Sequence, residues 1–483
     1  MFNGLISWSI RNRFVVLVLA FVLFASGVYL SLDANIDVLP EFAPPQVVVE
    51  TEAPGMVPEQ IEALVSIPLE STLNGMPGVE NVRSISLNGV SVITVIFHYG
   101  TDIYRARQLV AERLVVSSSG LPSSVKQPQM APLMPAIGDV LKIGLLSDKT
   151  SLMELRTIAD WDIKNRLLAV PGVARVLIIG GEVKQYQVLL DPRKLKSFRI
   201  SLREVSDAVQ KANVIAPGGY LVTEDRQLSI QGVARIRSLK DLENAVVTIR
   251  ENTPVLLKHI ARVQVGSDFK LGDTAINGHP GVYIYVTKQP GVNSVKLDRG
   301  LQKALTELKT ILPEDVRVLQ IFNQSKFIER SISNVIESIS LGGVLVVVIL
   351  IIFLLNWRPS VISLTAIPLS IITALIAIKF TGGTINTMSL GGLAIAVGEV
   401  VDDAIIDVEN VYRRLMENQS LAEPRPVHQV VYEACVEVRS AVVYATFIVV
   451  LVFIPVFTMP GVTGHIFSPL GFSYVVAILS SLL

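Results

Sequence analysis

The stretch AIAVGEVVDDAIIDVENVYRRL, residues 394–415, decides the fold, because it sets five acids inside an otherwise apolar segment. The acids are Glu399, Asp402, Asp403, Asp407 and Glu409, and on a helix they would occupy an arc of about 160°. An ionised carboxylate at mid-membrane costs about 2.5–3.5 kcal/mol, so an Asp402–Asp403 pair facing lipid would cost roughly 5–7 kcal/mol. We therefore expect this pair to face the interior of a helical bundle, to be protonated, or both.

Two adjacent carboxylates in a low dielectric also raise one another's affinity for protons. A pair that binds and releases protons near neutral pH is what a proton-coupled carrier requires. Asp402 and Asp403 are therefore the first candidates for proton exchange. For Asp407, Glu409 and Glu399 there is a second interpretation, in which they lie near the cytoplasmic end of the helix, where water reaches them.

The charges of the chain are distributed very unevenly. It has 483 residues with 42 basic and 42 acidic side chains, yet only 17 of these charges fall in residues 1–32 and 338–483. That distribution excludes a disordered chain, a fibre, and a nucleic-acid binder driven by bulk positive charge. The single cysteine, Cys435, excludes an intrachain disulfide framework and a cysteine-pair zinc site.

Long apolar runs in those charge-poor regions predict a membrane protein, since a helix needs about 20 apolar residues to cross a bilayer. We predict six spans, at roughly 14–32, 338–357, 360–379, 388–408, 440–457 and 467–483. The first could instead be a signal peptide, but its run is long and no small-residue cleavage site follows. The last span ends at Leu483 without a closing polar loop, which suggests a truncated chain.

Arginines mark one side of the predicted bundle. Arg11, Arg13, Arg358 and four arginines in 409–439 fall on the side of the N-terminus, whereas the opposite short loops hold only Lys379. The positive-inside rule then makes the N-terminus cytoplasmic. Residues 33–337 would lie outside, which in a bacterium means the periplasm.

The extramembrane part reads as repeated α+β units. Strands are predicted at 46–51, 79–86 and 90–97 and helices at 57–73 and 102–114, in the β-α-β-β-α order of a ferredoxin-like unit. The motif PGVENV (77–82) returns as PGVARV (171–176), after a second strand and helix at 140–145 and 151–170. We expect the second unit to continue with a strand pair at 173–179 and 185–190 and to close with helix 201–212. Two unrelated modules are the alternative.

Residues 182–274 read as an insertion that carries a long hairpin, from Gly219 to Gly232. A helix at 294–311 and a strand at 316–321 then resume the α/β pattern. Met130 and Met134 are close enough in sequence to be soft-metal ligands, although core packing suits thioethers better. No Walker loop is present, which argues against nucleotide-driven transport, and we expect no cofactor and no enzymatic activity.

These motifs resemble one family. VDDAIIDVEN (401–410), MSLGGLAIAVG (388–398), DVLPEFAPPQVVVETEAPG (37–55) and NQSKFIERSISNV (323–335) are similar to the N-terminal half of a resistance-nodulation-division (RND) transporter, most like its heavy-metal efflux branch. The resemblance implies proton antiport, a homotrimer in the bacterial inner membrane, a periplasmic adaptor and an outer-membrane channel. It also places the proton relay at Asp402, Asp403 and Glu409, with Glu399 and Asp407 as secondary acids.

The resemblance further implies a division of the chain, with the hairpin near Gly219 and Gly232 reaching a neighbouring subunit. After the cytoplasmic N-terminus (1–13) and the first transmembrane helix (14–33), 34–135 would form a first porter subdomain. Residues 136–181 and 275–332 would form a second porter subdomain, 182–274 a docking insertion, and 333–483 transmembrane helices 2–6. The chain departs from the copper/silver type, because Val400 and Asp407 stand where methionines would flank the aspartate pair.

Four functions remain open from the sequence. The first is proton-driven efflux of metal cations, and the second is efflux of amphiphilic organic molecules by the same fold. The third is a fragment that transports nothing alone, and the fourth is a membrane receptor with a ferredoxin-like ectodomain. The acids of 399–409 argue against the receptor.

Overall fold

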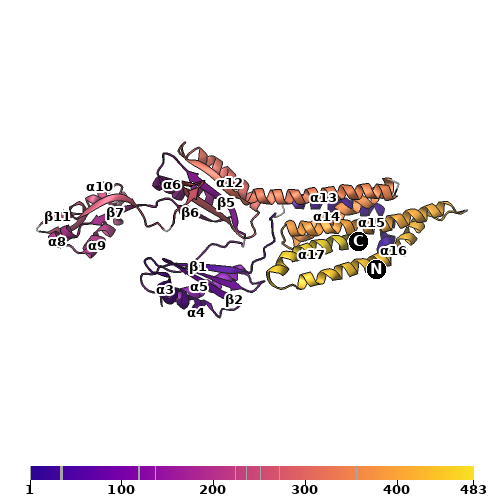
Figure 1. Cartoon of the computed structure of the whole chain (residues 1–483), viewed down its shortest axis with the longest axis horizontal. Helices are drawn as coiled ribbons and strands as arrows, with labels where there is room; N and C mark the ends of the chain where they lie inside the picture. Colours follow the sequence, from indigo (N-terminus) through magenta and orange to yellow (C-terminus); the bar gives the residue numbers. More distant parts are fainter. Residues whose placement is uncertain are drawn as a thin grey trace.

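The computed structural model describes residues 2–32, 36–117, 120–135, 137–223, 225–234, 236–250, 252–270, 272–354, 357–421 and 423–482. The molecule is elongated, with a small α/β unit at one end, two larger α/β units in the middle and a helical bundle at the other end (Figure 1). The predicted combination of a helical bundle with ferredoxin-like α+β units is confirmed.

The first α/β unit has a four-stranded antiparallel sheet in the order β2-β3-β1-β4, the order of a ferredoxin-like fold. Its strands alternate buried and half-buried residues, so one face packs against the helices. A π-helical turn interrupts its first helix between α3 and α4. Its elements are β1 (Gln46–Glu52), α3 (Pro58–Ile61), η1 (Glu62–Ser66), α4 (Ile67–Leu73), β2 (Val79–Leu87), β3 (Val90–Phe97), α5 (Ile103–Ser117) and β4 (Gln129–Met130).

The second α/β unit repeats this topology, with the sheet order β16-β5-β15-β6. A π-helical turn again interrupts its first helix, as in the first unit. Its elements are β5 (Asp139–Leu146), α6 (Leu152–Ile158), η3 (Ala159–Ile163), α7 (Lys164–Leu168), β6 (Val173–Gly180), β15 (Val282–Lys288), α12 (Ser294–Lys309) and β16 (Arg317–Asn323). Arg175 of β6 donates to Glu50 of β1 through Nη1 (2.7 Å) and Nη2 (3.2 Å), which joins the two units.

One prediction for the second unit is wrong. Strands 173–179 and 185–190 do not pair, because β6 pairs with β15 and β7 (Lys184–Leu190) pairs with β12 (Ala261–Ser267). Helix α9 (Leu202–Ala212) does not close the unit either; α12 does. The reason is burial: Val282, Ile284 and Val286 of β15 are fully buried in the core of the second unit, so the chain returns to it after the insertion.

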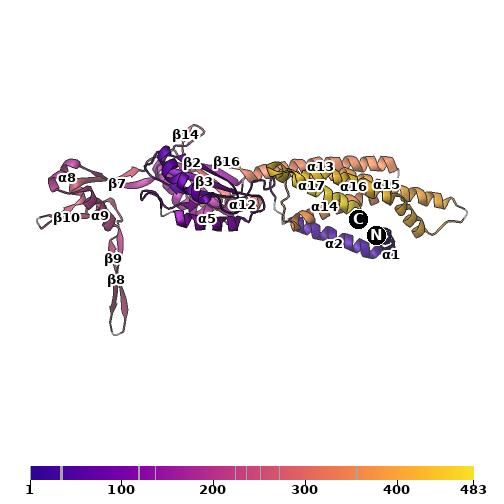
Figure 2. The ribbon, with the colours of Figure 1, turned by 90° about the horizontal axis from the view of Figure 1, so that it is seen from below.

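The inserted unit has its own small core, built around Leu242, Leu257 and Ile260. From it the β8–β9 hairpin projects away from the rest of the molecule (Figure 2). The remaining elements of this region are α8 (Pro192–Phe198), β8 (Val214–Val222), β9 (Gln227–Ala234), α10 (Leu239–Glu243), β10 (Val246–Arg250), β11 (Thr253–Leu256) and α11 (Leu257–Ile260). A short hairpin of β13 (Ala275–Ile276) and β14 (His279–Pro280) follows the insertion and leads into β15.

Five helices of the described residues are long and apolar enough to cross a membrane: α2 (Arg13–Leu32), α13 (Gln324–Leu354), α14 (Trp357–Phe380), α16 (Val427–Thr458) and α17 (Gly461–Leu482). The remaining predicted span, 388–408, lies in α15 (Thr387–Gln419), which is not among these five helices because it carries several acids. Helix α15 nevertheless packs against α13, α14, α16 and α17. A short helix, α1 (Phe2–Arg11), precedes α2.

Helices α15 and α17 approach each other closely at Gly392. A Cβ atom on Gly392 would overlap the carbonyl oxygen of Leu470 and the hydroxyl of Ser473. That hydroxyl donates a hydrogen bond to the carbonyl of Ser389 (2.8 Å). Gly391 and Gly398 of the same helix face open space, so of these three glycines only Gly392 permits the close approach.

A strap of three residues, 36–38, connects the bundle to the second α/β unit. The Asp37 amide donates to Ile385 (3.1 Å), and Thr387, at the start of α15, donates to the Val38 carbonyl through its amide (3.1 Å). The Asp37 carboxylate accepts from the ammonium of Lys288, at the end of β15 (2.8 Å), and from the Ser294 hydroxyl (2.8 Å). The Lys288 side chain is only 5% exposed, so this is a nearly dry ion pair.

We predict that Gly392→Ala destabilises the bundle by about 1–3 kcal/mol, because overpacking shifts α15 from α17. Gly391→Ala is the matched control; it adds a methyl group facing open space and should be neutral or slightly stabilising, since alanine favours helix. Thermal unfolding of the two purified variants in detergent measures the difference. Equal midpoints would mean that the α15–α17 crossing does not need a glycine.

We predict that Lys288→Met costs about 3–5 kcal/mol, because it leaves the Asp37 carboxylate poorly solvated and without its cation. The control is Lys296→Met on the exposed side of α12, which should leave the unfolding midpoint unchanged. An Asp37→Asn/Lys288→Met double variant should recover part of the loss. If Lys288→Met unfolds like the wild type, the ion pair does not hold the strap.

Candidate functional site

The five acids of α15 divide into two groups by helix geometry. Glu399, Asp403 and Asp407 are spaced by four residues and form one ridge, whereas Asp402 and Glu409 lie along the other edge of the same arc. The structure agrees, because the three ridge residues are half-buried and the two edge residues are exposed on this chain. The adjacent pair predicted from the sequence is therefore split between two environments.

Helix α15 is held firmly at its start. Asn386 caps the helix by accepting a hydrogen bond from the Ser389 amide (2.9 Å), and the Ser389 hydroxyl accepts from the Asn386 amide (2.9 Å). Leu393, Ala396 and Val400 are buried on the side of α15 that faces the bundle. This apolar packing fixes the rotation of the helix and sets the ridge at the border of the packed face.

Asp403 is surrounded by negative charge. Glu399, Asp407 and Asp402 all lie close enough to act on its charge, and Tyr474 of α17 is within the same field. One of its oxygens, Oδ2, is shielded from solvent and accepts no hydrogen bond. A buried ionised oxygen in that position is costly, and a bound proton would relieve the cost.

A cation faces the ridge from the next helix. Arg439 of α16 is 13% exposed, and its Nη1 lies 3.6 Å from Oδ2 of Asp407. Its Nη2 donates to the carbonyl of Leu482. Sequence reasoning missed this residue as a partner of the acids, since it counted Arg439 among the loop arginines. The position of Arg439 inside a long apolar helix is the signal that could have found it.

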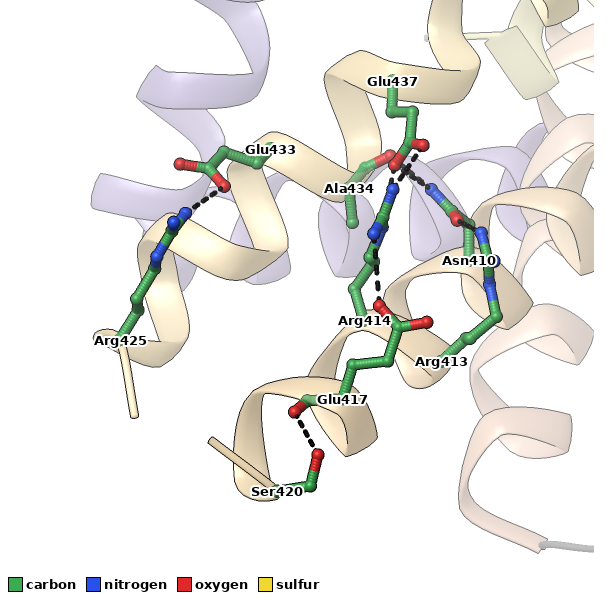
Figure 3. A network of polar contacts seen from close by, with 9 residues as sticks. All are labelled: Asn410, Arg413, Arg414, Glu417, Ser420, Arg425, Glu433, Ala434 and Glu437. Carbon is green, nitrogen blue, oxygen red and sulfur yellow. Dashed lines mark hydrogen bonds and ion pairs between the residues drawn. The ribbon is translucent and has the colours of Figure 1, made fainter. Parts of the chain in front are cut away.

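The elbow between α15 and α16 fixes which residues of the two helices face each other (Figure 3). The buried Asn410 side chain donates to the Ala434 carbonyl (2.9 Å) and accepts from Arg413 (2.8 Å). Arg414 binds Glu437 through two nitrogens (2.6 and 3.0 Å). Asn410 lies three residues after Asp407 and Glu437 two residues before Arg439, so these contacts set the register that brings the ion pair together.

The two candidate metal-binding methionines have different surroundings. Met130 lies on β4 opposite Val49 and packs against the core of the first unit. Met134 lines a cavity of about 210 Å³ between the two α/β units, together with Asp139 and Tyr285. Burial raises the pKa of the Tyr285 hydroxyl, as does its hydrogen bond to Asp139. The described residues contain no group of three or more His, Cys, Asp or Glu placed to hold a metal ion.

The hairpin of the inserted unit is longer than predicted. It runs from Val214 to Ala234, with Gly232 opposite Ala216. Gly219 adopts a left-handed conformation (φ +79°) at an irregularity in the pairing between Pro217 and Tyr220. The glycine therefore supports the shape of the β8 strand rather than its turn.

Comparison with known proteins gives consistent matches along the whole chain. The model of the AcrB/AcrD/AcrF family matches residues 5–483. The cation efflux system protein CusA of Escherichia coli K12 is 34% identical over 482 residues, covering 98% of this chain and 46% of the relative. The cobalt-zinc-cadmium resistance protein CzcA of Cupriavidus metallidurans is 31% identical over 500 residues, covering 100% and 46%.

A crystal structure of a heavy metal efflux pump has the same fold, with a TM-score of 0.88 at 29% identity, covering 99% of this chain and 47% of that one. The chain thus spans about half the length of the curated relatives it matches. The family match, the repeated ferredoxin-like units and the helical bundle agree with one another. The chain belongs to the AcrB/AcrD/AcrF family of resistance-nodulation-division efflux transporters.

Proposed function

We propose that this chain is part of a proton-driven efflux permease of the bacterial inner membrane that exports heavy-metal cations. The observation that carries the proposal is the ridge of half-buried acids on α15, a helix packed against four others. A carboxylate inside a membrane-spanning bundle is costly to keep ionised. Binding or releasing a proton therefore changes the energy of the helix that carries it, and with it the packing that the helix prefers. A secondary transporter couples such a change in conformation to the export of its substrate.

Asp402, Asp403 and Glu409 are the proposed proton carriers. Asp403 has the strongest support, because it is half-buried among like charges with one oxygen lacking a hydrogen-bond partner. Asp402 and Glu409 lie on the exposed edge of α15. Since the relatives are about twice as long as this chain, we propose that further helices of a longer polypeptide cover this edge.

Metal cations are favoured as substrates because the relatives are named for them, in the case of CzcA for cobalt, zinc and cadmium. Efflux of amphiphilic organic molecules is the second candidate, since the matching family model is that of AcrB, AcrD and AcrF. Growth of one efflux-deficient host on metal salts and on dyes separates the two candidates. Met130 and Met134 are weak candidates for contact with a soft metal, and the core position of Met130 counts against it.

The arrangement in the membrane is proposed from the arginine distribution and the family. The N-terminus would be cytoplasmic and residues 33–337 periplasmic. The subdomains would follow the boundaries expected from the sequence, with 34–135 and 136–181 plus 275–332 as porter subdomains and 182–274 as a docking insertion. The protein would act as a homotrimer with a periplasmic adaptor and an outer-membrane channel, and the β8–β9 hairpin, whose Tyr220 and Val222 are largely exposed, would reach a neighbouring subunit.

We predict that Asp403→Asn, and separately Asp402→Asn, lowers proton-coupled efflux at least tenfold when placed in the complete reading frame that contains this chain. The amide keeps the shape of the side chain but binds no exchangeable proton. Efflux is measured in proteoliposomes under an imposed pH gradient, with Zn²⁺ and Cu⁺ tested in turn. Asp207→Asn, on the exposed side of α9, is the matched control and should transport like the wild type.

Membrane insertion of the aspartate variants should match the wild type, because asparagine is less costly in a membrane than an ionised aspartate. Wild-type efflux by both variants would end the proton-relay proposal. Efflux lost together with insertion would point to a structural role for the acids.

We predict that the complete gene restores growth of an efflux-deficient host on salts of zinc, cobalt, cadmium or copper by a severalfold increase in tolerated concentration. Growth on cationic dyes and detergents should change little. Resistance to dyes alone would replace the metal proposal with amphiphile efflux. The chain of 483 residues expressed by itself, tested beside the complete gene, shows whether this part transports alone.

A further inference from the structure

Asp403 and Asp407 occupy similar positions on the ridge of α15, but only Asp407 lies in an ion pair with Arg439. Nη1 of Arg439 lies 3.6 Å from Oδ2 of Asp407, and the two side chains are 13% and 32% exposed. Asp403, one helical turn earlier, has no Lys or Arg within ion-pair distance among the described residues. Arg439 also attracts Asp403, but from beyond ion-pair distance, and each of the two acids has one buried oxygen that accepts no hydrogen bond. The ridge therefore contains one acid in an ion pair with the arginine next to one that the arginine reaches only at longer range.

Each helix packed against this part of α15 contributes different groups. Helix α16 contributes Arg439 and Cys435, both of which lie in the field of Asp407. Helix α17 contributes Tyr474, in the field of Glu399 and Asp403. Helix α14 contributes the Ser363 hydroxyl, which donates to the Ala404 carbonyl (3.4 Å).

Helix α13 faces α15 across a groove of about 440 Å³ whose lining residues are all uncharged. On α15 itself, Glu399 and Asp402 add negative charge around Asp403. Among these described groups around the ridge, Arg439 is the only cation. Its position at the far end of the ridge makes the electrostatic environment differ from one turn of α15 to the next.

An arginine is suited to hold one acid permanently ionised. The guanidinium group stays charged at every pH that a cell meets, so its attraction for Asp407 does not switch off. The same attraction is stronger in an apolar bundle than in water. This attraction opposes protonation of Asp407 against the effect of burial, and an anion at Asp407 would repel negative charge on Asp403.

We propose that Arg439 is a positioning residue that keeps Asp407 ionised, so that the ridge exchanges its protons at Asp403 rather than at Asp407. This inference rests on the proposed proton-coupled function and assigns separate roles within it. Asp407 and Arg439 form a fixed dipole, and Asp403 carries the proton. The exchange is simple proton transfer between the Asp403 carboxylate and water or a neighbouring carboxyl group, with no other bond made or broken.

The test measures protonated carboxyl groups directly, by infrared difference titration of the purified complete protein without substrate. The wild type should show a protonated-carboxyl band that titrates near neutral pH. The single variant Asp403→Asn should lack this band, and the single variant Asp407→Asn should retain it. Arg439→Gln should add a protonated carboxyl at neutral pH, and Asp407→Asn in that background should remove it. The proton occupancy of Asp407 at neutral pH should rise at least tenfold on loss of Arg439.

Conservative and matched variants complete the design. Arg439→Lys keeps the cation and should titrate like the wild type, and Arg425→Gln, at the exposed ion pair with Glu433, should do the same. If Arg439→Gln fails to insert, Asp407→Asn in the wild-type background still decides the matter. Loss of the neutral-pH band in that variant, or an unchanged titration in Arg439→Gln, would overturn the proposal.

The transport experiment tests the proton-coupled function, and the titration experiment tests the separate roles of Asp403 and Asp407, so one proposal can fail without the other. If both Asp402→Asn and Asp403→Asn leave efflux intact while the infrared results follow the expectation, then the proton-coupled function is wrong and the role of Arg439 is limited to electrostatics. If Asp403→Asn abolishes efflux but Asp407→Asn removes the neutral-pH band, then the function stands and the division of roles falls.

Discussion

The constraint on which the rest of the structure depends is the placement of carboxylates inside an apolar helical bundle. Charges in such a place must be paired, hydrogen-bonded or neutralised by protons, because hydrocarbon and packed side chains solvate them poorly. Helix α15 meets this constraint in two ways. Asp407 lies in an ion pair with Arg439, whereas Asp403 has no Lys or Arg within ion-pair distance among the described residues. Each of the two carboxylates keeps one buried oxygen that accepts no hydrogen bond. The close crossing at Gly392 and the elbow at Asn410 hold the helix in the rotation that produces this contrast.

Much of the fold could be predicted from the sequence, because local patterns decide it. The alternation in 46–51 and the Asn-Gly turn before 90 give β1, β2 and β3 close to their observed bounds. The error lay in pairing across the insertion. The residue pattern of β6 is compatible with β7 or with β15 as its neighbouring strand. Only the packing of the hydrophobic core decides between these two pairings. Val282, Ile284 and Val286 complete the core of the second unit, and that contact spans an insertion of about ninety residues that no local pattern reveals.

The candidate site was predicted in part for the same reason. Its acids are adjacent in sequence, and the helical period of α15 places Glu399, Asp403 and Asp407 on one ridge without reference to any other element. Arg439 lies 32 residues after Asp407, and its position depends on where α15 ends and how α16 turns back. Asn410, Arg414 and Glu437 set that geometry through hydrogen bonds and an ion pair between helices. Such contacts depend on tertiary packing, so the ion pair between Arg439 and Asp407 could not be predicted from the sequence alone.

The end of α15 opposite the elbow is tied to the α/β units. Thr387 is bonded to the strap at Val38, and the adjacent Asp37 is bonded to Lys288 and Ser294 in the second unit. The first unit reaches the bundle separately, where Tyr99 stacks on His465 near the start of α17 (ring centroids 4.0 Å apart). A shift of α15 along its axis must therefore either break the Thr387–Val38 bonds or carry the strap with it, and the strap is fixed to β15 and α12 by an ion pair that is almost dry. A change of charge on the acid ridge thus acts on a helix whose far end is joined to the second unit through few, strong contacts, while α17 is joined to the first unit.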